Sequence, residues 1–403
     1  MGRCCLGLFP HSLKDILCVG SSRCGGSTTA DAALSPLNFT LSSHGPRCHC
    51  TGRKPSYQSR RVSRLHSGET VPSLSILIPF YDDLQEAIEL AQLTRSQVKT
   101  AEQIQSILIG LDPSRQADLS VGLPRAANIE VIFCDSYQGF PKAKDAGLRA
   151  SSGEMVFFLY PGIEPQPGAI DHLLTQLQAH PDWGAVTGCW RNGRGLVEKG
   201  YNVRRFPTFR ALLWDVLFIN KLFPRNRTTR HYKMHDFDYS SVCQADHSND
   251  SVFMARRRLL IDLGGFGEFY RFGWFDQVEV CRKLNQDGHP VYFDPGAMFV
   301  STNRPTLVNR LLADHYSDFY SDQERYVRRE FGFWRAKIFR VSLAVGMVLR
   351  LTFVRVFPLQ LRSWLLKRFH SYVGDQYLQG MSQSYVSLLR TLIQAGPTKE
   401  RTD

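Results

Sequence analysis

The sequence lacks several patterns that mark common functional classes. No Gly-x-Gly-x-x-Gly follows its first apolar stretch, which argues against a dinucleotide-binding dehydrogenase. Cys48-His49-Cys50 has no second spaced pair, so it does not indicate a zinc site. The first 70 residues contain no long apolar segment, and a secretory signal is therefore not predicted.

Acidic residues are scarce at both ends of the chain. Residues 1–70 hold nine Lys/Arg and three Asp/Glu, and residues 331–403 hold eleven and three. These ends carry +6 and +8 of a total net charge of +12, so residues 71–330 carry −2. A nearly neutral centre argues against nucleic acid as a partner, whereas the basic ends suit an anionic surface.

Residues 1–70 are predicted to be a disordered basic extension. They are rich in Ser, Gly, Thr and Arg and show neither helical nor alternating periodicity. Two interpretations stay open: an organelle transit peptide, and an extension without function from a mis-assigned start.

Residues 71–330 predict an α/β domain with a parallel sheet, because apolar strands alternate with helical segments. The stretch 94–127 is too long for an ordinary crossover, so an insertion or mobile loop is expected there. Strands are expected at 74–82, 128–135, 154–160 and 184–188, and helices at 83–105, 139–150 and 170–179.

Ligands of such sheets bind beyond the carboxyl ends of the strands. Pro79-Phe80-Tyr81, Asp135 and Tyr160-Pro161-Gly162 all occupy such ends. These residues are therefore the first candidates for a binding site.

The stretch from Asp250 to Ser301 is the most specific part of the sequence. Arg256-Arg257 open a short helix, which Gly264-Gly265 end. An aromatic loop then leads to a second helix that begins near Asp276. The spacing alone fits an ordinary helix-loop-helix part of an α/β core.

The amino-acid sequence of this stretch resembles that of the inverting family 2 glycosyltransferases, especially their rhamnosyltransferase-like branch. The resemblance covers about residues 71–330 and implies the GT-A fold, an α/β sandwich that binds nucleotide sugars. It is carried by Leu74–Tyr81, Glu130–Asp135, Lys142–Gly147, Gly153–Leu159, Gly264–Glu268, Asp276–Cys281 and Pro295–Ala297, in the family's order.

The resemblance implies roles for the matching residues. Asp135 stands where the family recognises the nucleotide base, while Lys144 and Asp145 replace the usual Arg and Asn. The implied nucleotide-binding residues are Pro79, Phe80, Tyr81, Asp135, Lys144, Asp145 and Tyr160. The implied acceptor-side residues are Arg256, Glu268 and Trp274, and the catalytic candidates are Asp276, Gln277 and Glu279.

The family's metal motif is altered in this chain. Its Asp-x-Asp, whose last carboxylate holds Mg²⁺ or Mn²⁺ on the donor diphosphate, is replaced by Tyr160-Pro161-Gly162. Glu164 is the candidate substitute, and a solvated surface carboxylate is the alternative. The family's late His aligns with Ser301, and His315 follows too far along the chain to be assumed equivalent.

The general base is altered as well. An inverting transferase needs a carboxylate that takes the proton of the acceptor hydroxyl. The family's Glu-Asp pair is Asp276-Gln277 here, so Asp276 keeps a carboxylate one position early. The alternative interpretation of Asp276 is a helix N-cap.

Residues 331–403 predict a basic amphipathic helical tail. The segment 335–368 holds eight Lys/Arg and no acid, and its apolar run is too short and too charged for a standard spanning helix. Such a helix suits an anionic membrane surface, and a helix packed on the core is the alternative. The residues predicted to share its basic side are Lys337, Arg340, Arg350 and Arg355.

Two functional hypotheses follow. The first is an inverting glycosyltransferase that moves a sugar from a UDP- or dTDP-linked donor to a glycan or lipid-linked glycan. It would lie peripherally on the cytoplasmic face of a membrane, or enter an organelle if residues 1–70 are a transit peptide. The second is a non-catalytic relative that keeps the fold and binds a glycan, a nucleotide or a partner protein.

Overall fold

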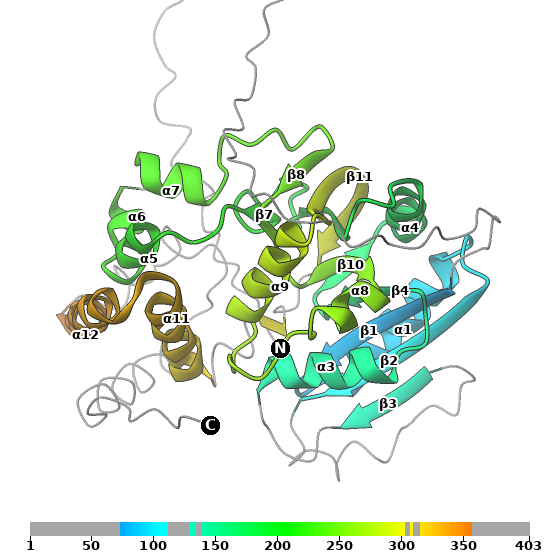
Figure 1. The fold of residues 1–403 in the computed structure, drawn as a ribbon, viewed down its shortest axis with the longest axis horizontal. Coiled ribbons are helices and arrows are strands. Elements are labelled where there is room, and N and C mark those ends of the chain that lie inside the picture. The colour runs from blue at the N-terminus through cyan, green and yellow to red at the C-terminus, as the bar shows by residue number, and fades with distance from the viewer. Residues whose placement is uncertain are drawn as a thin grey trace, which may run out of the picture. The chain divides into compact units, whose positions relative to one another are not determined.

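The computed structural model describes residues 73–111, 129–133, 139–223, 225–302, 307–308 and 315–356 (Figure 1). The predictions for residues 1–70, for Asp135 and for the tail beyond residue 356 lie outside this part of the chain. All of these described residues belong to one compact unit.

A nine-stranded mixed sheet forms the centre of this unit, in the order β3-β2-β1-β4-β10-β6-β11-β5, with β8 paired to β11. Six of these strands run in one direction, and β5, β8 and β10 run against them. The predicted α/β class with a mostly parallel sheet is confirmed. The strands are β1 (Ser73–Phe80), β2 (Gln103–Gly110), β3 (Ile129–Phe133), β4 (Met155–Leu159), β5 (Ile163–Pro165), β6 (Ala185–Arg191), β8 (Cys243–Ala245), β10 (Val252–Arg256) and β11 (Val291–Ser301). A separate two-stranded sheet joins β7 (Val203–Arg204) to β9 (His247–Ser248).

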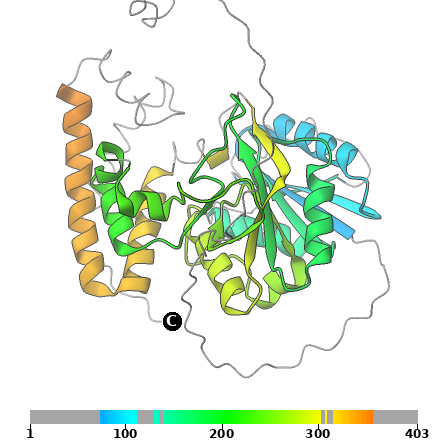
Figure 2. The same ribbon diagram turned by 90° about the horizontal axis from the view of Figure 1, so that it is seen from above.

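Helices cover both faces of the sheet, because its central strands carry apolar side chains on both sides (Figure 2). One face packs against α1 (Leu84–Gln97) and α4 (Ala169–Ala179). The other face packs against α3 (Phe140–Ala150), α8 (Arg257–Asp262) and α9 (Phe275–Gln286).

Two strands differ from the sequence prediction. The helix expected at 83–105 ends at Gln97, and β2 then occupies part of the expected insertion 94–127. Strand β10, with the sequence Val-Phe-Met-Ala-Arg, precedes the helix expected to open at Arg256. Both strands lie between two others, and residues 106–110 of β2 and 252–255 of β10 are buried on both faces, so these runs lack the alternation that identifies a half-buried strand.

A helical group packs beside the sheet. It contains α5 (Phe209–Val216), α6 (Ile219–Leu222), α7 (Arg227–Tyr232), α11 (Tyr316–Phe331) and α12 (Phe333–Val356). The predicted boundary at residue 330 falls at the end of α11, where Gly332 adopts a positive φ of 87° and turns the chain into α12. No helix in the described ranges is long and apolar enough to cross a membrane.

Candidate functional site

The order of the strands reverses next to β1. Strands β2 and β3 follow β1 on one side, whereas β4 pairs with β1 on the other side. Ligands of open α/β sheets bind at the carboxyl ends of the strands beside such a reversal. The end of β1 supplies Tyr81, the end of β4 supplies Tyr160, and the start of antiparallel β10 brings Asp250 to the same edge.

The end of β1 is closed by aromatic rings. Pro79 lies opposite Ile109 in the sheet, and the buried ring of Phe80 meets Phe133 edge-on at 5.9 Å. Tyr81 is the next residue, and its ring meets the ring of His315 edge-on at 6.0 Å. Both rings are buried, and Tyr81, with 8% of its surface exposed, is the more accessible of the two.

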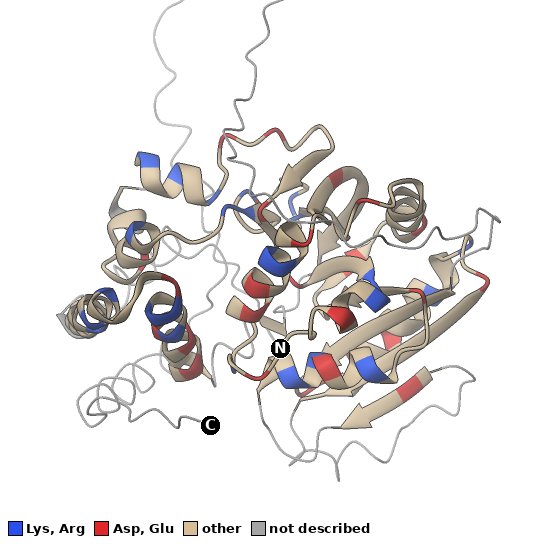
Figure 3. Cartoon of the chain, in the orientation of Figure 1, with Lys and Arg blue, Asp and Glu red and all other residues tan. Residues whose placement is uncertain are grey.

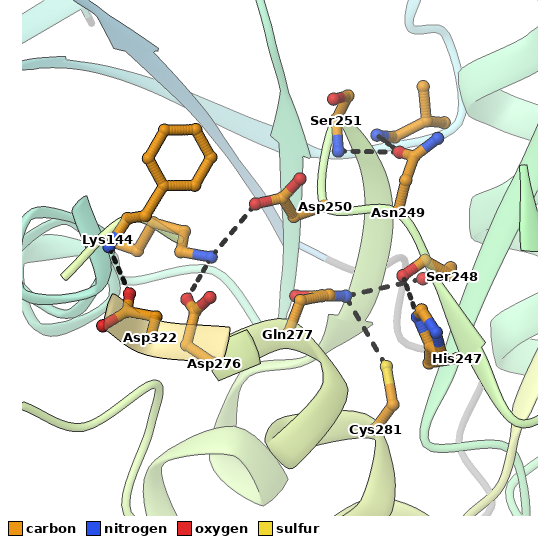
Figure 4. Close-up of polar contacts among 12 residues, drawn as sticks. Lys144, His247, Ser248, Asn249, Asp250, Ser251, Asp276, Gln277, Cys281 and Asp322 are labelled. Carbon is orange, nitrogen blue, oxygen red and sulfur yellow. Dashed lines mark hydrogen bonds and ion pairs between the residues drawn. The ribbon is translucent and has the colours of Figure 1, made fainter. Parts of the chain in front are cut away.

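A fully buried lysine lies beneath this edge (Figure 4). The Nζ atom of Lys144, on α3, lies 2.5 Å from Oδ2 of Asp276 and 3.3 Å from Oδ2 of Asp250. The ammonium also lies 4.2 Å from the ring centroid of Phe266 and 5.0 Å from that of Phe140. We call Lys144, Asp250 and Asp276 the buried ionic cluster.

The electrostatics of the cluster favour an ionised lysine. Burial opposes the charge of Lys144, but Asp276 and Asp250 outweigh burial, and the pKa of Lys144 is raised. Burial also raises the pKa of Asp250, and the charge of Asp276 adds to this rise. The pKa of Tyr160 is raised by burial and by the same two carboxylates, so its phenol stays protonated at neutral pH.

The start of α9 positions Asp276, which is the second residue of this helix. The helix N-cap is Trp274, so the alternative interpretation of Asp276 as the N-cap is wrong. Asp276 instead lies in the first turn, where the helix dipole favours a negative charge. Its side chain has no solvent-exposed surface, and its Oδ2 is the atom that contacts Lys144.

The two other catalytic candidates have structural contacts. Gln277 is buried, and its Nε2 donates to Oγ of Ser248 at 3.4 Å. Glu279 lies one turn along α9, where it pairs with Arg329 of α11 at 2.6 Å and with Lys283 at 3.5 Å. Glu279 therefore fastens α9 to α11, outside the buried ionic cluster.

Asp145, predicted to bind nucleotide, fastens a turn. Its carboxylate accepts the backbone N–H groups of Phe266 at 2.8 Å and Gly267 at 3.0 Å. A Cβ atom on Gly265 would lie 2.3 Å from Oδ1 of Asp145, so this position requires glycine. Burial raises the pKa of Asp145, and the two N–H donors work against that rise.

The predicted acceptor-side residues are not gathered in one place. Arg256 lies opposite Met155, the first residue of β4, and therefore at the amino edge of the parallel strands. Its guanidinium donates to the carbonyls of Trp183 at 3.1 Å and His180 at 3.2 Å, just beyond the end of α4, which gives it a structural role.

Glu268 and Trp274 belong to the loop before α9. Glu268 is exposed and pairs with Lys142 at 3.3 Å. The guanidinium of Arg204 lies 4.4 Å from the Trp274 ring, within the range of a cation–π contact. These residues border the loop but do not touch the buried ionic cluster.

Three acidic residues that lie in or near the candidate site were not identified from the sequence. Asp250 was passed over because β10, which it precedes, was not identified as a strand. Asp318 pairs with His315 at 3.4 Å, and this bond lowers the pKa of Asp318. Asp322, in the middle of α11, accepts the backbone N–H groups of Arg271 and Phe272, both at 2.7 Å. Only their position as acids in an amphipathic helix could have indicated the last two.

The described residues do not fit a divalent cation. Glu164 lies with its side chain exposed on the short strand β5, and no group of three His, Cys, Asp or Glu within the described ranges could hold a metal. The carboxylates of Asp250 and Asp276 already hold the ammonium of Lys144. Ser301, which aligns with the family's late His, accepts a hydrogen bond from Nε1 of Trp190 at 2.6 Å.

No protein-family model and no curated protein matches the sequence. Similar solved structures include GalNAc-T7 with UDP, GalNAc and Mn²⁺, at a TM-score of 0.44 and 12% identity over 64% of this chain and 52% of that one. The chain therefore spans about half the length of GalNAc-T7. The mannosyltransferase PcManGT from Pyrobaculum calidifontis in complex with GDP-Man and Mn²⁺ has a TM-score of 0.42 at 14% identity, over 81% and 88%. TarS from S. aureus has a TM-score of 0.39 at 14% identity, over 79% and 54%.

Proposed function

We propose that this chain is a GT-A glycosyltransferase that binds a nucleotide-sugar donor at the carboxyl edge between β1 and β4. The observation that carries this proposal is the reversal of strand order beside β1, which brings Tyr81 and Tyr160 to a single edge. The motif resemblance of residues 71–330 supplies the class of ligand.

The donor is proposed to carry a UDP or dTDP group. The proposal places the pyrimidine against the ring of Tyr81 at the end of β1, and Asp135 follows β3, whose last residue lies at the same edge. His315 lies beside Tyr81, and Asp318 pairs with the imidazole of His315 at 3.4 Å. In the proposed complex this carboxylate holds His315 in place next to the donor.

We assign the transfer an inverting course, with a glycan or lipid-linked glycan as acceptor. Asp276 is the family-aligned carboxylate at the start of α9, and acting as a base requires it to leave the ammonium of Lys144. No step is assigned to a metal, because the carboxylates at this edge are occupied by Lys144.

A second candidate function is a non-catalytic nucleotide- or glycan-binding protein. The observation that favours it is the burial of Asp276 against Lys144, combined with the amide of Gln277 where the family has its second acid. A chain of this kind would keep the donor edge and lack turnover.

Titration of the full chain with UDP, dTDP and GDP tests the donor site. We expect saturable binding of a pyrimidine nucleotide, weakened about 5- to 150-fold by Tyr81→Ala, since base–aromatic stacking contributes about 1–3 kcal/mol. Tyr292→Ala is the matched control, because Tyr292 lies near the amino end of β11. Absence of saturable binding by all three nucleotides contradicts the proposal.

Release of free nucleotide from UDP- and dTDP-sugars then separates the two functions. A transferase should lose about 10²- to 10⁴-fold in turnover on Asp276→Asn if Asp276 is its base. Nucleotide binding without any turnover identifies the non-catalytic protein. Turnover that survives Asp276→Asn removes Asp276 from the mechanism.

A further inference from the structure

Helix α12 has a packed face and an apolar face that no described residue covers. Ala336, Phe339, Leu343 and Met347 are buried in a cluster shared with α5 and α11. The opposite side carries large apolar side chains that are 47–74% exposed, with Trp334 the most exposed. We call these residues the outer stripe: Trp334, Ile338, Val341, Val345, Val348 and Leu349.

The outer stripe is continuous along α12. From Trp334 to Val348 its residues follow one another at intervals of three or four, and Leu349 lies four residues after Val345, which places them on one side of the helix. Figure 2 shows α12 at the margin of the compact unit, with α5 and α11 on its inner side. Contiguous exposed apolar surface of this kind marks an interaction site in a soluble protein.

The charge around the outer stripe has one sign. The 24 residues of α12 include five Lys/Arg and no Asp or Glu (Figure 3). Arg335 and Lys337 are exposed in its first turns, and the ammonium of Lys337 lies 4.6 Å from the Phe333 ring. Arg328, in the last turn of α11, lies 5.9 Å from the same ring. We call Arg328, Arg335 and Lys337 the basic corner.

Arg340 and Arg350 differ from the sequence prediction. Arg350, predicted on the basic side, is buried, and its guanidinium donates to the carbonyl of Val216 at 3.1 Å and lies 3.9 Å from the Phe218 ring. Arg340 is half-buried and lies 3.8 Å from Glu324. Both side chains hold α12 against its neighbours, which keeps the outer stripe turned away from the protein.

We propose that the outer stripe and the basic corner form a docking surface for an anionic membrane. The apolar side chains would enter the boundary between headgroups and acyl chains, with Trp334 at its edge, and the basic corner would contact lipid phosphates. A second copy of α12 fits less well, because a parallel pair would bring two basic corners together with no acid on either helix. Charge complementarity therefore favours anionic lipid.

The test is co-sedimentation of the full chain with vesicles. One set contains phosphatidylcholine alone, and the other contains phosphatidylcholine and phosphatidylserine in equal amounts. We expect binding to the anionic set that weakens with added salt. Arg335→Gln with Lys337→Gln should reduce it about fivefold per charge removed, and Arg258→Gln, at an exposed arginine of α8, should leave it unchanged.

The stripe itself is tested by Val341→Asp with Val345→Asp. This pair should abolish vesicle binding without moving the unfolding midpoint, since both residues are exposed. Val242→Asp, at an exposed valine outside α12, is the control. Failure of the unaltered chain to bind the anionic vesicles, or binding that survives the stripe variant, overturns the proposal.

Light scattering distinguishes the other occupant. The unaltered chain could be a dimer that does not bind vesicles, with Val341→Asp and Val345→Asp converting it to a monomer. That result would show that a second copy covers the outer stripe, and it would also overturn the proposal. Nucleotide titration of the same variant should be unchanged, so the outcome is independent of the donor site.

Discussion

Lys144 has no solvent-exposed surface and two carboxylates as neighbours. Removing a single ammonium from water costs several kcal/mol, and only close opposite charges offset that cost. The cluster holds one more carboxylate than it holds cations. The raised pKa of Asp250 favours its neutral, protonated form, and protonation of Asp250 would remove the excess negative charge.

Removal of the lysine charge alone should therefore destabilise the fold strongly. We expect Lys144→Met to lower the free energy of unfolding by about 3–5 kcal/mol, the cost of leaving buried partners uncompensated. Lys142→Met, on the same helix, removes only an exposed pair with Glu268 and should cost less than about 1 kcal/mol. Denaturant titration of both variants measures the difference.

Neutralising the partners supplies the second arm of this experiment. Asp250→Asn with Asp276→Asn in the Lys144→Met background should recover much of the lost stability, because no buried charge then remains. A Lys144→Met protein as stable as Lys142→Met would show that the cluster is not buried in solution.

The sequence could single out Lys144 and Asp276 but not their contact. Each was identified through a motif, one as a nucleotide contact and the other as a base. Asp250, which contacts Lys144, lies 106 residues away from it along the chain. Pairing at that distance depends on the order of β4 and β10 in the sheet, which no local pattern encodes.

At the scale of elements, two helices and the strands β1, β3, β4 and β6 were predicted closely, whereas the strands β2 and β10 were missed. The helix expected at 170–179 runs from Ala169 to Ala179, and that at 139–150 runs from Phe140 to Ala150. Each has one apolar side and a glycine N-cap. Residues 106–110 of β2 and 252–255 of β10 are buried on both sides, so only their neighbours in the sheet distinguish them from other buried segments.

Asp322 links two elements, α11 and the aromatic loop before α9, and it gives that link a pH dependence. Burial raises its pKa to about 6, although Phe272 and Arg271 donate to it. A carboxyl whose pKa is raised in the folded state contributes stability below its ordinary pKa of 3.8, and loses that contribution as the pH rises through about 6.

We expect Asp322→Asn to remove this dependence. An amide oxygen can still accept both backbone N–H groups, which share Oδ2 in the wild type. Between pH 4 and pH 6 the wild type should lose about 2 kcal/mol relative to the variant. Urea titrations across that range measure the difference, and parallel pH profiles of the two proteins would contradict the raised pKa.

On the scale of the whole molecule, the main question is whether α12 belongs to the same folded unit as the sheet. The sequence left two interpretations of the tail, a helix on a membrane and a helix packed on the core. Phe339, Leu343 and Met347 pack with α5 and α11, while the outer stripe of the same helix remains exposed. The composition of α12 could not distinguish its packed face from its exposed face, because both faces are apolar. Two of its cations, Arg340 and Arg350, also turn towards the protein.

Neighbouring residues of α12 test whether this helix and the sheet unfold together. Phe339 is fully buried and Ile338 is 53% exposed. Phe339→Ala should cost about 3–5 kcal/mol through lost burial and a cavity, whereas Ile338→Ala should stay within about 0.5 kcal/mol. Hydrogen exchange of the amides of β4 gives the readout for the sheet. In one cooperative unit, Phe339→Ala lowers the protection of these amides as much as it lowers global stability. If α12 were an independent tail, the protection of β4 would be the same in both variants.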